Sequence, residues 1–407
     1  MFSAYEKQLL LESTLQSSRW YFRNQNTDKN PWGGMKNSAD NGRFVYEYFP
    51  ATKLGRGAGV WAQALGIMAL GSVNWGGGKS YEYWHREESI KLAAGYLCNL
   101  QFKDNVDETK NGGFAEHTPN ELESYPRDAA TGGIGLCVLY RLTGDKKYLQ
   151  YAENFAKWYR NHGSDKNGWP YISFDFKKGC GTNKAIAVEG ESGGEEYIKG
   201  DWQAGGGLAY YYLASISGNK KYLTDYFYPL MEMLVALYEA NPFEGAVPGF
   251  HGEVPISFGN DDFALVTLLG AYHASKNKKY YEIARSRIYD FFKFWDEPTG
   301  RFPSLAGTFV SGITLKVFAD LEESEGRKVD QKVLDAIKKI ALTGLEIQAF
   351  DYNEPRIHGG YWGQSEYGAG KDRIHHRSTG YATVFYSMLS YPKMTPFYHI
   401  LNWDLPK

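Results

Sequence analysis

Cysteine is scarce in this chain. Its 407 residues include three cysteines, an odd number with none of the paired spacings that hold a zinc ion. Cys98 and Cys137 lie in apolar helical contexts, so we expect both to be buried thiols. Few cysteines exclude a disulfide-rich scaffold and favour a reducing compartment.

Long apolar runs and a leader-like N-terminus are missing as well. No run reaches the length needed to span a bilayer, and Met1 to Lys7 do not form a basic segment followed by an apolar one. We therefore expect a cytoplasmic protein with no membrane partner, unless a secretion signal has been removed. The formal net charge of −2 supplies no field that attracts polyanions, which argues against a nucleic-acid partner. The oligomeric state stays open.

Several catalytic templates are also absent. The chain has no Gly-x-Ser-x-Gly elbow, no P-loop and no His-Glu-x-x-His motif. Its nine histidines are scattered, apart from the adjacent His375 and His376. We therefore expect neither a metal site nor a cofactor.

The chain does contain a repeated turn. A glycine followed within two residues by an aromatic side chain recurs six times ahead of an apolar helical stretch. Spacings of roughly 50 to 80 residues are typical of one supersecondary unit per repeat. Aromatic residues form 16% of the chain, enough for stacking on sugar rings as well as for packing between helices. The turns contain Gly42, Gly112, Gly168, Gly249, Gly300 and Gly359.

Two kinds of helix alternate along the chain. Segments that are apolar nearly all round should be buried as inner helices, and amphipathic ones should lie outside them. We expect inner helices at 57–72, 128–142, 201–216, 261–274, 308–322 and 379–391. We expect outer helices at 80–102, 147–161, 221–240, 279–295 and 330–348. An N-terminal helix, 4–24, would pair with 379–391. Because no linker interrupts the pattern, residues 1–407 are predicted to form a single all-α domain, an (α/α)6 toroid.

Three inner helices begin with aspartate. Asp128, Asp201 and Asp262 lie roughly 16 to 19 residues ahead of a repeated Lys-Lys-Tyr turn, so their positions are equivalent. An aspartate at a helix start caps the helix and offsets its dipole. Two such residues facing each other would also supply the general acid and base that cleave a glycosidic bond, which stand roughly 5 to 9.5 Å apart.

The loops near these aspartates carry groups suited to a sugar acid. Arginine forks with His or Tyr donors suit a planar carboxylate such as that of a uronic acid, and indole rings suit a sugar face. A solvated loop with incidental charges is the alternative interpretation. The candidate substrate-binding residues are Arg127, Trp202, Gln203, His251, Glu253, Tyr361, Trp362, His375, His376 and Arg377.

The hairpins, the aspartates at inner-helix starts and the aromatic loops resemble the six-hairpin glycosidase superfamily. The likeness covers nearly the whole chain and points to members that act on uronic acids, such as unsaturated glucuronyl and rhamnogalacturonyl hydrolases and exo-glucuronidase-like enzymes. In the unsaturated uronyl hydrolases, two Asp at the starts of neighbouring inner helices carry catalysis. The resemblance transfers these roles to Asp128 and Asp201, with Trp202 as an aromatic platform. The flanking residues differ from those families' patterns, so ordinary hydrolysis stays open beside hydration.

These features predict a glycoside hydrolase that removes a terminal uronic acid, saturated or unsaturated, from an oligosaccharide substrate. Asp201 would act as acid/base, with Asp128 or Asp262 as its partner. Two alternatives fit the same sequence. One is a polysaccharide lyase, in which Tyr or His removes the C5 proton, and the other is a sugar-binding toroid without catalysis. The glycan and its linkage stay open.

Overall fold

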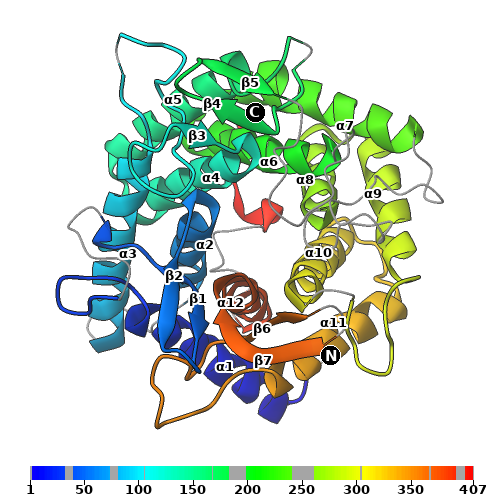
Figure 1. The fold of residues 1–407 in the computed structure, drawn as a ribbon. Coiled ribbons are helices and arrows are strands. Elements are labelled where there is room, and N and C mark those ends of the chain that lie inside the picture. The colour runs from blue at the N-terminus through cyan, green and yellow to red at the C-terminus, as the bar shows by residue number, and fades with distance from the viewer. Residues whose placement is uncertain are drawn as a thin grey trace. The chain divides into compact units, whose positions relative to one another are not determined.

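Helices dominate the computed structural model (Figure 1). It describes residues 2–32, 40–73, 81–104, 106–166, 168–182, 199–240, 261–302, 305–365, 368–390 and 399–406. The α-helices of these residues are α1 (Ala4–Arg23), α2 (Val60–Gly71), α3 (Tyr81–Leu100), α4 (Pro126–Thr143), α5 (Lys146–Asn161), α6 (Lys199–Ser217), α7 (Tyr228–Ala240), α8 (Asp261–Ser275), α9 (Lys278–Phe291), α10 (Leu305–Ser324), α11 (Gln331–Glu346) and α12 (His376–Ser390). All twelve predicted helices are present, and among the described residues none has the length and apolarity to cross a membrane.

The contacts of the chain fall into two compact units. The first combines Met1–Leu97 with Phe294–Asn402, and the second combines Cys98–Lys293 with Trp403–Lys407. In the first unit α12 packs against α1, α2 and α10, which confirms the predicted pairing of the N-terminal helix with the last one. In the second unit α6 packs between α4 and α8. In each unit, therefore, helices predicted to be inner ones pack against one another.

A glutamine ties each of three repeated turns to the helices beside it. Gln101 follows α3, and its Nε2 donates to the carbonyl oxygens of Gly112 and Tyr151, both at 3.0 Å. One side chain thus joins a helix end, a turn and the next outer helix. Equivalent pairs of bonds run from Gln25 to Gly42 and Ser89, and from Gln348 to Gly359 and Ser13.

The turn glycines are required by the backbone. Gly112 has a φ of +96°, and a Cβ atom there would lie 2.2 Å from the carbonyl oxygen of Asn154 on α5. Only glycine combines this backbone angle with so close an approach. Positive φ recurs in the turns at Gly42, Gly168, Gly300 and Gly359, whereas Gly249 lies outside the described residues.

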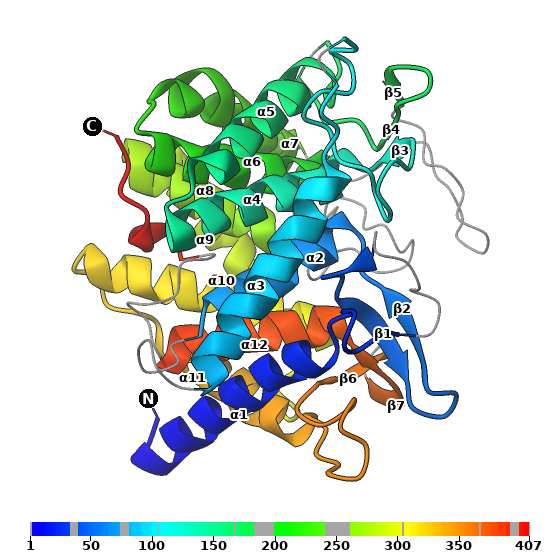
Figure 2. The same ribbon diagram turned by 90° about the vertical axis from the view of Figure 1, so that its left-hand side faces the viewer.

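Two small antiparallel sheets form in stretches whose sequence predicts only polar loops. The first sheet has the order β2-β1-β7-β6, from β1 (Val45–Phe49), β2 (Leu54–Gly57), β6 (Trp362–Ser365) and β7 (Gly368–His375). The second has the order β3-β4-β5, from β3 (Glu123–Ser124), β4 (Ser173–Asp175) and β5 (Cys180–Thr182). As Figure 2 shows, β7 leads into α12 and β3 leads towards α4. Each sheet therefore positions the first turn of an inner helix.

Candidate active site

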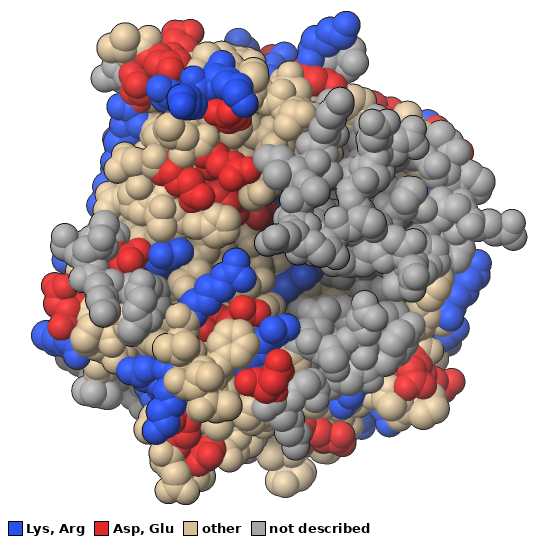
Figure 3. All heavy atoms as spheres, viewed as in Figure 1, with Lys and Arg blue, Asp and Glu red and all other residues tan. Residues whose placement is uncertain are grey.

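A cluster of acids surrounds the start of α4 in the second unit. Glu116 follows the turn of Gly112 and is 2% exposed. Its backbone N–H donates to the carbonyl of Glu123 at 3.0 Å, and this bond folds the intervening loop back toward α4. Asp128 lies in the first turn of that helix. Figure 3, viewed as Figure 1, shows acidic side chains gathered where Figure 1 places β3 and α4.

The Asp128 carboxylate is bound by side chains. Arg127 donates from Nε to Oδ1 of Asp128 at 2.8 Å, and the carboxyl groups of Glu116 and Asp128 are hydrogen-bonded to each other. The N-cap of α4 is Tyr125, and no side-chain capping bond is made there. Asp128 therefore does not cap α4, although capping is the role expected of an aspartate at a helix start.

Glu116 is the proton donor of this carboxyl pair. Burial, and after it the neighbouring Asp128 charge, raise the pKa of Glu116 well above its ordinary value, although the backbone N–H of Tyr125 and the charge of Arg127 oppose the shift. A buried neutral carboxylic acid next to a carboxylate is typical of sites that tune acid and base groups apart. Burial also raises the pKa of Tyr125, whose hydroxyl is hydrogen-bonded to Glu123.

Sequence reasoning does not identify Glu116, because nothing in Glu116-His117 alone predicts a partner. The available signal is its place two residues after the buried Phe114, in a turn that is otherwise apolar. A charged residue at such a place is rarely buried without a partner.

A second cluster forms on the four-stranded sheet of the first unit. Glu47 of β1 is paired in register with Arg56 of β2 on one side and His375 of β7 on the other. Directly opposed residues in an antiparallel sheet share a face. Oε1 of Glu47 consequently lies 3.4 Å from Nε of Arg373 and 3.7 Å from Nε2 of His375. The carboxylate of Glu47 thus balances the positive charge of Arg373 on β7.

Both candidate histidines of this unit are buried and neutral. Although Glu47 lies close to His375, burial and the charges of Arg377 and Arg373 hold the pKa of His375 well below its ordinary value. Burial lowers the pKa of His376 to about 4. His376 is 0% exposed and packs among Trp20, Tyr21, Phe44 and Tyr46. Neither imidazole offers a positive charge to a substrate carboxylate.

We expect His376 to make the fold sensitive to acid. Because its native pKa of about 4 lies below the ordinary 6.5, the stability it contributes is present above pH 6.5 and is lost as the pH falls from there towards 4. At about 1.4 kcal/mol per pH unit, the loss reaches at most about 3 kcal/mol. Urea unfolding at pH 7 and pH 5 should show a smaller loss for His376→Gln than for the parent. His117→Gln, at a half-exposed histidine, should keep the parental loss, and an equal loss in His376→Gln would contradict the assignment.

Three other predicted binding residues are spread over this unit. Tyr361 is 0% exposed, its hydroxyl lies 2.6 Å from Oγ of Ser13, and it packs on Phe309 in the core. Trp362 begins β6 and is half-buried. Arg377 is half-buried in the first turn of α12 and is already engaged by other groups.

The remaining predicted residues are not placed. The backbones of Asp201, Trp202 and Gln203 belong to α6 and that of Asp262 belongs to α8, but their side chains lie outside the described part of the structure. His251 and Glu253 lie outside the described residues altogether. Of the predicted site, the structure therefore brings together Asp128 with Arg127, and His375 with His376 and Arg377.

Comparison with known proteins identifies the fold. Neither a protein-family model nor a curated protein sequence matches the chain. Among solved structures, cellobiose 2-epimerase from Spirochaeta thermophila is 14% identical with a TM-score of 0.67, covering 94% of this chain and 96% of its own. A GH76 α-mannanase from Bacteroides thetaiotaomicron is 15% identical with a TM-score of 0.63, covering 94% and 95%. A D-mannose isomerase is 10% identical with a TM-score of 0.68, covering 95% and 99%. The predicted all-α (α/α)6 toroid is confirmed, and at these identities the likeness shows the fold alone.

Proposed function

We propose that this toroid is a carbohydrate-active enzyme, a glycoside hydrolase that removes a terminal uronic acid from an oligosaccharide. The observation that carries the proposal is the hydrogen-bonded pair of Glu116 and Asp128, backed by Arg127, at the start of an inner helix. Several proteins of the same fold are named as enzymes that act on sugars, including the α-mannanase, the epimerase and the mannose isomerase.

In this proposal Asp128 is the base of the reaction. Asp128 is 7% exposed and Glu116 is 2% exposed, so Asp128 is the more accessible of the two to a substrate. The hydrogen bonds from Arg127 and Glu116 hold the orientation of the Asp128 carboxyl group. Asp128 would remove a proton from the attacking water, or stabilise the positive charge that develops at the anomeric carbon.

Glu116 is a positioning residue and not the catalytic acid. Acid and base of a glycosidase stand roughly 5 to 9.5 Å apart, whereas these two carboxyl groups are hydrogen-bonded. The acid that protonates the leaving oxygen must come from another residue. We propose Asp201, with Asp262 as the alternative, on the strength of their equivalent positions in the repeat.

Turnover of three substrate types tests this function. The protein is expected to release the sugar acid from an aryl glucuronide or from an unsaturated uronyl disaccharide. Chromatography and ultraviolet absorbance measure the release. Loss of the absorbance of the conjugated uronate indicates hydrolysis of the unsaturated sugar, and its appearance on a uronate polymer indicates a lyase. If the protein binds these sugars without turnover, it is a sugar-binding protein, and the proposed function is contradicted.

The neutral His375 favours a second candidate, a sugar isomerase or epimerase. A neutral imidazole next to a carboxylate can remove the proton on the carbon beside a sugar carbonyl, and His375 has Glu47 at 3.7 Å. Two of the solved structures with this fold are a cellobiose 2-epimerase and a D-mannose isomerase. Incubation with cellobiose or mannose in deuterated water would incorporate deuterium at C2 if this candidate holds, and a glycosidase would leave C2 unlabelled.

A further inference from the structure

Cavities recur where outer helices run into the repeated turns. Three of them lie around Gln25, Gln101 and Ser164, which follow α1, α3 and α5, and have volumes of about 330, 510 and 180 Å³. The repeat therefore generates the same hollow more than once, with different side chains around it. The cavity at Gln101, which we name the Gln101 pocket, is the largest of the three and falls within the usual range for small-molecule sites.

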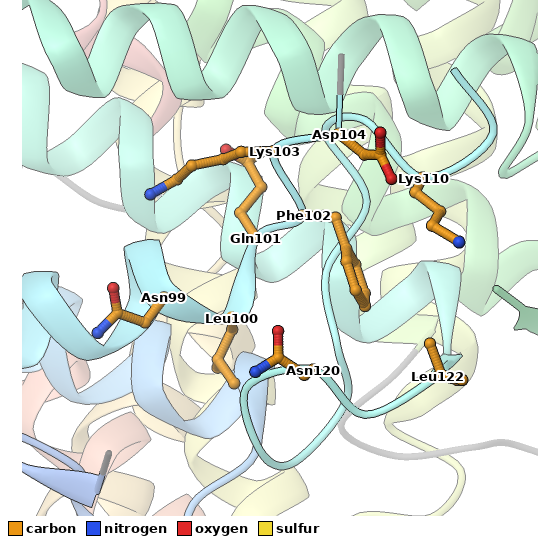
Figure 4. A pocket seen from close by; sticks show the side chains of 9 residues that line it. All are labelled: Asn99, Leu100, Gln101, Phe102, Lys103, Asp104, Lys110, Asn120 and Leu122. Atoms are coloured by element: carbon orange, nitrogen blue, oxygen red, sulfur yellow. The ribbon is translucent and has the colours of Figure 1, made fainter. Parts of the chain in front are cut away.

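The linings of the three cavities differ in chemistry. The cavity at Ser164 is lined by tyrosines and apolar side chains together with Arg160 and Asp225, and the one at Gln25 carries Asp28 and Glu88 beside Lys29 and His85. The Gln101 pocket instead combines two lysines, Lys103 and Lys110, with amides and apolar side chains (Figure 4). Its lining thus suits a ligand with hydroxyl groups and negative charge.

Apolar surface and amides form the wall of the Gln101 pocket. The Phe102 ring packs on the buried Phe176 with a centroid distance of 4.4 Å and is itself half-buried. In Figure 4 this ring points towards the segment that carries Asn120 and Leu122. Leu122 is 44% exposed, and Asn120 holds a φ of +70°. A ring face beside amide donors and acceptors is typical of sugar recognition.

The charges of the Gln101 pocket favour an anion. Asp104 is the single carboxylate of the lining, and its Oδ1 already accepts the backbone N–H groups of Val106 and Asp107, both at 2.9 Å. The Lys110 ammonium forms an ion pair with the Asp107 carboxylate, with Nζ 3.1 Å from Oδ2. Lys103 is exposed, with its ammonium 4.8 Å from the centre of the Tyr151 ring. A carboxylate entering here meets the ammonium groups of Lys103 and Lys110, the second of which it shares with the Asp107 carboxylate. The lining carboxylate, that of Asp104, is already hydrogen-bonded.

We propose that the Gln101 pocket is a second glycan-binding site, which holds a stretch of an acidic oligosaccharide apart from the acid cluster of Glu116 and Asp128. The two sites share no lining residue. The inference rests on the proposed function for the identity of the ligand. The pocket would hold the non-reacting part of a long substrate and raise its local concentration at the enzyme.

Direct binding tests this site without any turnover. Calorimetry with tetragalacturonate is expected to show binding that weakens about tenfold or more in the double variant Lys103→Gln, Lys110→Gln, and that weakens with added salt. A matched control is Lys278→Gln, Lys293→Gln, since Lys293 pairs with Asp290 at 3.2 Å three residues away, as Lys110 does with Asp107. The control should bind as the parent does.

Several results would overturn the second site. These are equal binding by the pocket variant and the control, equal binding of neutral cellotetraose, and no binding of tetragalacturonate by the parent. Binding is measured directly, so the test of the second site gives a result even if the protein cleaves no uronide. Failure of the second-site proposal is therefore distinguishable from failure of the proposed function. Where turnover occurs, the pocket variant should lose activity on a uronate polymer and keep the parental rate on an aryl glucuronide.

Discussion

Replacing Asp128 with asparagine is expected to lower the kcat of uronide cleavage by about 10²- to 10⁴-fold, the usual contribution of a general base. The amide is nearly isosteric but cannot take a proton, and it pairs more weakly with Arg127 and Glu116. Substrate binding should change little, because the change removes an interaction made mainly in the transition state. Steady-state kinetics on an aryl glucuronide, with thermal unfolding to verify the fold, measures the effect.

Asp145 provides the control for a merely structural aspartate. It is the N-cap of α5, and its side chain accepts the N–H of Lys147 at 3.0 Å, so it performs the capping role that Asp128 does not. Asp145→Asn should keep full turnover, since asparagine caps about as well as aspartate. Full turnover in Asp128→Asn as well would remove Asp128 from the mechanism.

Glu116→Gln separates positioning from catalysis. It keeps a hydrogen-bond donor beside Asp128 and should retain more activity than Asp128→Asn. Because burial raises the native pKa of Glu116, the parent holds its full stability below the ordinary pKa of a glutamate and loses stability as the pH rises through the raised value. Glutamine has no proton to lose, so the variant should lose less stability than the parent on going to alkaline pH. An identical decline in both would contradict the protonated pair.

Replacing Gly112 with alanine is expected to destabilise the fold by about 2 to 6 kcal/mol. Backbone strain at a φ of +96° accounts for about 1 to 3 kcal/mol. The new Cβ would also lie 2.2 Å from the carbonyl oxygen of Asn154, and relief of such overpacking costs about 1 to 3 kcal/mol. Urea unfolding monitored by circular dichroism measures the difference in free energy.

Gly144→Ala is the matched control. Gly144 also has a positive φ, of +70°, but a Cβ there would meet no atom within 4 Å. The expected cost is about 1 to 2 kcal/mol, from the left-handed conformation alone. If both substitutions cost the same, the close contact between the turn and α5 would add nothing to stability.

The sequence predicts the helices well because their signals are local. The apolar stretches that became α4 and α12, and the Gly144-Asp145 turn that separates α4 from α5, each depend on residues near one another in the chain. The sheets are different. Glu47 meets His375 only because β1 and β7 pair across more than three hundred residues, and no periodicity in either stretch announces that pairing.

The candidate site was predictable in part for the same reason. Asp128 lies at a helix start, which a sequence marks, and it does belong to a cluster of chemically coupled groups. Glu116 joins it through a loop that folds back by one backbone bond to Glu123, and such a bond has no sequence signature. The sequence also predicts His375 and His376 as carboxylate ligands from their residue type, whereas burial leaves both imidazoles uncharged.

The glutamine ties have a consequence for engineering. Gln101 closes its turn on Gly112 before the chain reaches the loop that carries Glu116 and Glu123. The hydrogen bonds of Gln101 that join α3, the turn and α5 therefore involve no residue of the loop that follows Phe114. Loops of this kind tolerate replacement better than the elements they connect. Grafting loops of other lengths and chemistries between Glu116 and Leu122, which leaves β3 and its pairing with β4 in place, should change the surroundings of the acid cluster while the helical scaffold continues to fold. The same framework of helix, glutamine and turn is thus repeated along the chain, and each repeat carries a loop of different chemistry.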